Sequence, residues 1–142
     1  MLSNTNVSEL IIPDSVTSFP DYTFYNMNNL KKLTIPITVN AGRWIFNTGK
    51  LEELKLTKGT TGIGFDYDLS YASRTPWYYS REVGGANATS IGSNPLKVTI
   101  GSDIAKIGNY TFYNSYRVQL QSSISGITIG SNAFTNSGAN IN

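Results

Sequence analysis

The sequence predicts a repeat solenoid, in which short parallel strands stack along one side of a coil. Three observations support this fold class. A pattern of spaced apolar residues recurs along the chain, the pentapeptide Tyr-Thr-Phe-Tyr-Asn occurs twice, and charged residues make up only 14% of the 142 residues. So few charges disfavour long exposed helices, while a repeated unit can cover its apolar side chains by stacking on its neighbours.

The repeated unit has the spacing L-x-x-L-x-I. It occurs at Val7, Leu10 and Ile12, again at Leu30, Leu33 and Ile35, and again at Leu51, Leu54 and Leu56. A fourth copy includes Val98 and Ile100, and a looser fifth copy starts at Val118, with an insertion of about two residues in its register. The copies follow one another at the short period that is typical of leucine-rich-repeat solenoids, roughly 20 to 29 residues. We therefore expect one domain over residues 1–142, with about five repeats and an irregular aromatic-rich insertion at about 65–94.

Each repeat is expected to begin with a strand and continue through turns. Alternation points Leu10 and Ile12 into the coil and leaves Glu9 and Ile11 outside. Pro13 ends the first strand because it lacks an N–H, and Gly101 ends the fourth because it permits a turn. An aromatic pair then packs on the side opposite the strand, Tyr22 with Phe24 in the first copy and Tyr110 with Phe112 in the fourth.

Composition excludes several classes of function. The chain has no Cys and no His, which removes disulfides, thiol nucleophiles, the Ser-His-Asp triad and the usual zinc sites. A net charge of +2 with scattered Lys and Arg gives no footprint for nucleic acid. No apolar run is long enough to span a membrane, and the first residues do not form a signal peptide. We expect no enzyme, no cofactor, no nucleic acid and no membrane span.

Residues 12–19 (Ile-Pro-Asp-Ser-Val-Thr-Ser-Phe), the repeated pentapeptide and residues 129–134 (Ile-Gly-Ser-Asn-Ala-Phe) resemble the BspA-like leucine-rich repeats of bacterial surface antigens. The resemblance covers nearly the whole chain apart from the insertion. It implies a curved right-handed solenoid, with the strands on the concave side and mostly loops and turns on the convex side. It also implies a secreted or cell-surface location and a role in adhesion to host components rather than in catalysis.

The outer face of the strands is the first candidate binding surface. By register, one column is expected to contain Glu9, Lys32, Glu53, Lys97 and Arg117, and the next Ile11, Thr34, Lys55, Thr99 and Gln119. The candidate ligand-binding residues are Ile11, Lys32, Thr34, Lys55, Lys97, Thr99, Arg117 and Gln119. Aligned side chains over several strands could form a recognition surface, or they could form a solvated face that only keeps the strands in register.

The insertion is the second candidate surface. Its candidate aromatic platform consists of Tyr67, Tyr71, Trp77, Tyr78 and Tyr79. Such rings could stack on sugar faces, or they could fill space over neighbouring coils. Asp66 and Asp68 form a D-x-D pair, but two carboxylates do not make a metal site, so we expect no metal.

Two functions compete. The first is a non-enzymatic adhesion or protein-interaction module that binds a host extracellular-matrix protein or a glycan. The alternative is a structural spacer within a larger surface protein. The repeat pattern begins almost at once and continues nearly to the last residue, so we also expect a fragment of a longer array, or end-to-end self-association through uncapped terminal coils.

Overall fold

The computed structural model describes residues 6–20, 23, 27, 29–37, 40–41, 51–59, 95–113, 115 and 117–139. These residues form strands and turns, and none of them lies in a helix.

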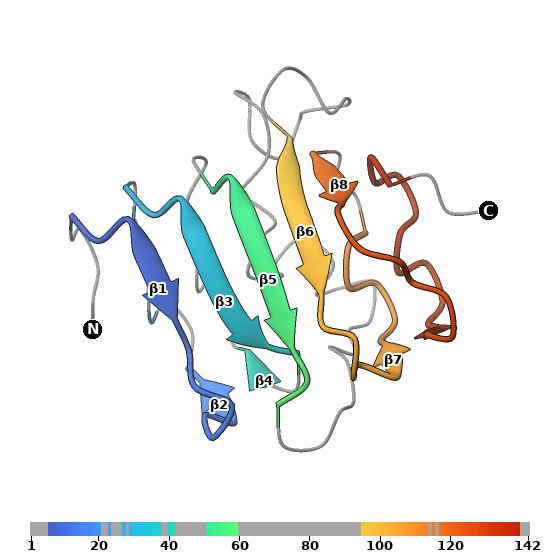
Figure 1. Cartoon of the computed structure of the whole chain (residues 1–142), viewed down its shortest axis with the longest axis horizontal. Coiled ribbons are helices and arrows are strands. Elements are labelled where there is room, and N and C mark those ends of the chain that lie inside the picture. Colours follow the sequence, from blue (N-terminus) through green and yellow to red (C-terminus); the bar gives the residue numbers. More distant parts are fainter. Residues whose placement is uncertain are drawn as a thin grey trace.

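Five short strands form one parallel sheet. They are β1 (Glu9–Ile11), β3 (Lys32–Pro36), β5 (Glu53–Thr57), β6 (Leu96–Ile100) and β8 (Val118–Leu120), paired in the order β1-β3-β5-β6-β8. Figure 1 shows them side by side in chain order, as expected when each coil of a repeat adds one strand. The parallel-strand repeat fold is confirmed, whereas the right-handed sense of the coil and the number of repeats remain predictions.

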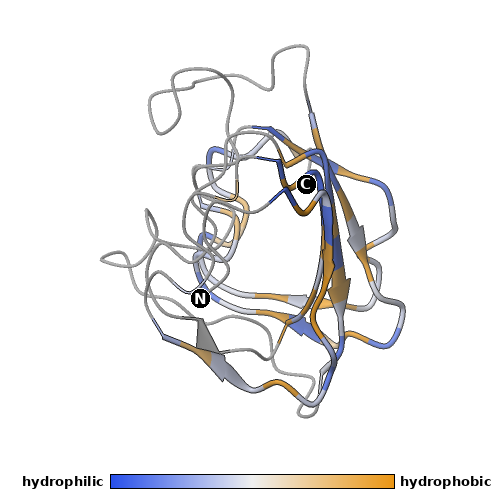
Figure 2. Cartoon of the chain, turned by 90° about the vertical axis from the view of Figure 1, so that its left-hand side faces the viewer, coloured by the Kyte–Doolittle hydropathy of each residue, from blue (hydrophilic) through white to orange (hydrophobic). Residues whose placement is uncertain are grey.

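Alternation along each strand places the apolar residues in the core. Leu33 and Ile35 of β3 are buried, as are the equivalent Leu54 and Leu56 of β5, and hydrophobic and hydrophilic residues alternate along the strands (Figure 2). In the first coil Ile12 is buried and Ile11 is 63% exposed, which confirms the predicted inward and outward positions. The core therefore lies behind the sheet, and the other face of the sheet is free to carry polar side chains.

Each strand ends at a corner. The amide of Val16 donates to the carbonyl of Pro13 (3.0 Å), and the amide of Ile104 donates to the carbonyl of Gly101 (3.1 Å), so Pro13 and Gly101 begin equivalent turns. The chain then forms a second, two-residue strand that the sequence analysis did not predict. These strands are β2 (Ser18–Phe19), paired with β4 (Asn40–Ala41), and β7 (Lys106–Ile107), paired with β9 (Thr128–Ile129), all parallel.

The ring of Phe112 packs into the core, as predicted. This ring is buried and stacks on Phe134 of the next coil, with ring centroids 5.2 Å apart. The threonine of the repeated pentapeptide makes the same hydrogen bond in both copies, from Thr23 Oγ1 to the carbonyl of Pro20 and from Thr111 Oγ1 to that of Gly108, each at 2.7 Å. In the second copy Tyr110 to Tyr113 are turn residues, and the side chain of Thr111 holds this turn. The other predicted aromatic pair, Tyr22 with Phe24, lies outside the described residues.

The last coil has no insertion in its register, so that prediction is wrong. Leu96 pairs with Val118 and Lys106 with Thr128, so the same offset in residue number holds from the first strand of the coil to its second. Gly130 follows this second strand. A Cβ at Gly130 would lie 2.6 Å from the backbone nitrogen of Asn109, so the close stacking of these two coils requires glycine at this position.

Candidate functional site

The outer face of the main sheet presents two rows of aligned side chains, here called the sheet face. Strand pairing places Glu9, Lys32, Glu53, Lys97 and Gln119 in the upper row, and Ile11, Thr34, Lys55 and Thr99 in the lower row. Parallel strands lie about 4.8 Å apart, so neighbours within a row are within reach of one ligand. For the four strands from β1 to β6, the predicted columns are confirmed.

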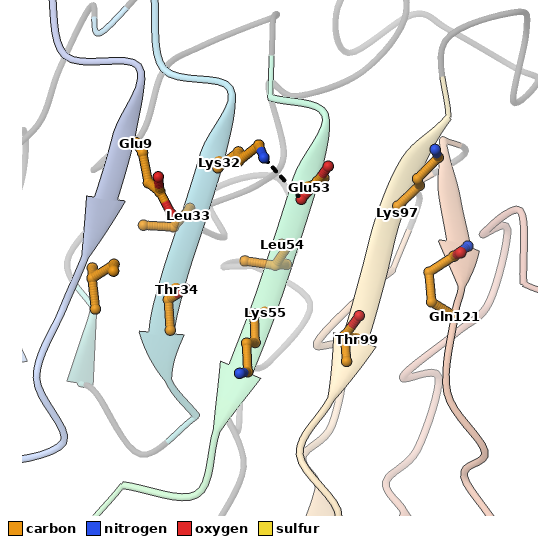
Figure 3. Close-up of a pocket in the computed structure, with 11 residues that line it drawn as sticks. Glu9, Lys32, Leu33, Thr34, Glu53, Leu54, Lys55, Lys97, Thr99 and Gln121 are labelled. Atoms are coloured by element: carbon orange, nitrogen blue, oxygen red, sulfur yellow. Dashed lines mark ion pairs between the residues drawn. The ribbon is translucent and has the colours of Figure 1, made fainter.

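A hollow of about 540 Å³ lies over this face (Figure 3). Charged and polar side chains of both rows line it, and the buried Leu33 and Leu54 lie beneath it. Among the described residues, the lining consists of Glu9, Ile11, Lys32, Leu33, Thr34, Glu53, Leu54, Lys55, Lys97, Thr99 and Gln121. The hollow therefore brings together six of the eight predicted residues of this face, namely Ile11, Lys32, Thr34, Lys55, Lys97 and Thr99.

Arg117 is not on the sheet face, so its predicted position in the exposed column is wrong. Its side chain is buried, with only 3% of the residue exposed, and its guanidinium donates to the carbonyl of Leu51 at 2.9 Å. Arg117 directly precedes β8, which begins at Val118, so the alternation of the strand does not extend to it. A buried guanidinium that hydrogen-bonds a core carbonyl serves the fold and cannot reach a ligand on the outer face.

Gln119 is exposed, but it lies in the upper row, whereas the prediction placed it in the lower row. It pairs with Lys97, whereas the prediction set it beside Thr99. The residue that joins the hollow from this end is Gln121, whose amide N–H donates to the carbonyl of Val98 at 2.8 Å. The sequence analysis missed Gln121 because it counted an insertion in the last coil. The correct offset between the last two coils could have been read from two matches in the sequence. Ile107-Gly108 recurs as Ile129-Gly130, and Phe112 recurs as Phe134, at the same separation in residue number.

Charges on the sheet face are partly paired. Lys32 Nζ lies 3.8 Å from a carboxylate oxygen of Glu53, and the neighbouring Lys31 and Glu52 approach to 3.5 Å. All four side chains are more than half exposed, so each pair contributes less than about 1 kcal/mol to stability. Lys55 and Lys97 are exposed, and neither forms an ion pair with any residue that the structure describes. The β5–β6 side of the hollow is therefore its more positive side.

The candidate aromatic platform, Tyr67, Tyr71, Trp77, Tyr78 and Tyr79, lies outside the described residues, as do Asp66 and Asp68. Within the described residues no group of three or more Asp or Glu side chains is placed to hold a metal ion. A search of the same residues found no helix with the length and hydropathy needed to cross a membrane.

Comparison with known proteins supports the pattern of the repeats. The family model for the BspA type leucine rich repeat region matches residues 1–70 and 88–142, in 6 copies. The unmatched residues fall within the predicted insertion. No curated protein and no solved structure matches the chain significantly. The matched ranges contain all nine described strands and every residue of the hollow, so the chain belongs to the BspA-type leucine-rich repeat family.

Proposed function

We propose that this chain is an adhesion module of a bacterial cell-surface or secreted protein, and that it binds a host extracellular-matrix protein or glycan through the sheet face. Members of this family are generally surface-associated, non-enzymatic repeat proteins that serve in protein interaction. The observation that carries the proposal is the hollow over β1 to β6, where exposed side chains from four strands stand in register. A surface of this kind offers many weak contacts that add up over one ligand.

The test is binding of the purified chain to an array of extracellular-matrix proteins and glycans. A triple variant, Lys32→Gln, Lys55→Gln and Lys97→Gln, removes the cations of the hollow. The matched control is Lys31→Gln, Lys58→Gln and Lys106→Gln, which removes the same number of charges and also breaks one exposed ion pair, but lies outside the hollow. We expect saturable binding that falls at least tenfold in the first variant and less than twofold in the control.

Binding that survives in both variants would move the proposed surface from the sheet face to another part of the chain. The aromatic residues of the insertion are the next candidates, and replacing Trp77, Tyr78 and Tyr79 by Ser would test them in the same assay.

A spacer is the alternative function. The exposed pair Lys32–Glu53 favours it, because this pair satisfies part of the charge on the face without a ligand. A spacer predicts that no array component binds with measurable affinity. End-to-end self-association through the terminal coils also remains a prediction, and β1 and β8 are the outer strands of the described sheet through which it would occur.

A further inference from the structure

The two lysines that form no ion pair within the described residues stand on neighbouring strands of the hollow. Lys55 lies on β5 opposite Thr99, and Lys97 lies on β6 opposite Glu53, so the two lysines are diagonal neighbours. Figure 3 shows their side chains running toward opposite ends of the hollow. Two separate ammonium groups of this kind suit a ligand with two anionic groups better than a ligand with one.

The acidic side chains of the hollow do not cancel this charge. Glu53 is already paired with Lys32, and Glu9 stands on β1, three strands away from Lys97 in the sheet. Thr99 and Gln121 add neutral hydrogen-bonding groups on the same side as Lys97. A carboxylate placed here would thus meet cations and hydrogen-bond donors together.

The lining also favours a protein over a sugar. None of the 11 described residues that line the hollow is aromatic, so this part of the chain offers no ring there on which a sugar face could stack. It does offer Ile11, which is 63% exposed and is the only large hydrophobic residue so exposed in the described part of the chain. An apolar contact beside cationic contacts is typical of the surfaces that bind peptides.

The distances fit an extended chain that crosses the strands. Neighbouring strands lie about 4.8 Å apart, so β1, which carries Ile11, is about 10 Å from β5, which carries Lys55. It is about 14 Å from β6, which carries Lys97. An extended peptide advances about 3.3 Å per residue, so three or four residues span the gap. Resting on the function proposed above, we infer that the hollow binds an extended acidic segment of a partner protein, with carboxylates on Lys55 and Lys97 and an apolar side chain on Ile11.

The test uses ten-residue peptides with a central leucine followed by glutamates two and four residues later, which an extended chain places on the same side as the leucine, and fluorescence anisotropy as the measurement. A second peptide replaces both glutamates by lysine, and a third replaces the leucine by serine. We expect the acidic peptide to bind at least tenfold more tightly than the lysine peptide and about threefold more tightly than the serine peptide. This comparison changes the ligand only, so it stands even if a variant of the protein folds poorly.

The variants test the two lysines directly. Lys55→Gln with Lys97→Gln is expected to weaken binding of the acidic peptide at least tenfold, and Lys58→Gln with Lys106→Gln less than twofold. Both doubles lose the same charge, so a difference between them reports local contact rather than long-range attraction. Glu9→Gln is expected to leave the affinity equal or to raise it. An equal loss in the two doubles would overturn the inference, and so would weaker binding after Glu9→Gln.

Heparin, a sulfated polysaccharide, is the competing probe. Binding of heparin that depends on Lys55 and Lys97, without binding of the acidic peptide, would overturn the inference in favour of an anionic glycan and leave the proposed function standing. If no array component binds either, the proposed function fails as well and the chain is a spacer.

Discussion

Arg117 places a guanidinium at an inward position that the inner repeats fill with leucine. In register it corresponds to Leu51, whose carbonyl accepts its hydrogen bond from two strands away. Its own carbonyl accepts from the amide of Leu96 at 2.7 Å. A long side chain that reaches across β6 thus joins the last strand of the described sheet to β5, and this role is structural.

The burial of Arg117 gives a prediction that separates it from the lysines of the sheet face. Arg117→Gln is expected to lower the free energy of unfolding by about 1–3 kcal/mol, because a shorter side chain leaves the buried carbonyl of Leu51 without its donor. Lys97→Gln removes the same charge from an exposed site and is expected to cost less than about 0.5 kcal/mol. Urea denaturation followed by circular dichroism measures both. Equal effects would contradict the buried position of Arg117.

Arg117 was predicted to lie outside because the last copy was taken to start at Val118, which set Arg117 in the column of Lys97. The rule of alternation holds only where the backbone is extended, and β8 begins one residue after Arg117. The same rule was correct for Lys32, Lys55 and Lys97, which lie within strands. Buried Arg is rare enough that composition alone would not have suggested this position.

At the scale of elements, the strands with the full L-x-x-L-x-I pattern were predicted in register, and the others were not. β3 and β5 each carry two inward leucine or isoleucine residues, β6 carries three inward apolar residues, and Leu10 of β1 is followed by the buried Ile12, so these strands are fixed in their alignment. In the last coil the second of these positions is Ser122, whose hydroxyl accepts from the amide of Ile100 at 2.8 Å. Because serine is polar, the apolar pattern that marks the register in the other coils is missing at this position. The two-residue strands β2, β4, β7 and β9 were not predicted, because a segment of two residues shows no periodicity.

Equivalent leucines on different strands allow a matched prediction of element stability. Leu54 on β5 is 1% exposed and has neighbouring strands on both sides, whereas Leu10 on β1, at the same register, is only partly buried. We expect Leu54→Ala to cost about 2–5 kcal/mol and Leu10→Ala less than half as much, because the cavity at the edge is open to solvent.

Thermal and urea unfolding of the two variants measures this difference. Hydrogen exchange adds an independent check, since the amides of β5 should exchange more slowly than those of β1 if the inner strands form the stable part of the sheet. Similar costs for the two leucines would indicate that the first coil is as well covered as the inner ones.

For the whole molecule, stability comes from the apolar core and from neutral hydrogen bonds. The core runs through all the described coils, from Ile12 to Ala133, and the two ion pairs of the described residues are exposed. Charged residues are few throughout the sequence, at 14%. Screening by salt should therefore change the folded state little, while it should weaken contacts made by exposed lysines.

A salt titration tests this division. Raising NaCl from about 0.05 M to about 0.5 M is expected to change the free energy of unfolding by less than about 0.5 kcal/mol. Over the same range, binding of the acidic peptide should weaken severalfold. The two measurements use the same sample and the same buffer series. A large loss of stability at high salt would contradict the prediction, because it would show that ion pairs hold the coils together.

The spacing between paired strands has a consequence for how such a chain can change. The chain from Glu9 to its partner Lys32 is longer than the chain from Lys32 to its next partner Glu53, yet both pairs remain in register. The segments between the strands therefore differ in length while the strands stay in register. Duplicating one coil's length of coding sequence would add one strand and one position to each row of the sheet face. A larger sheet face can therefore arise in a single recombination event.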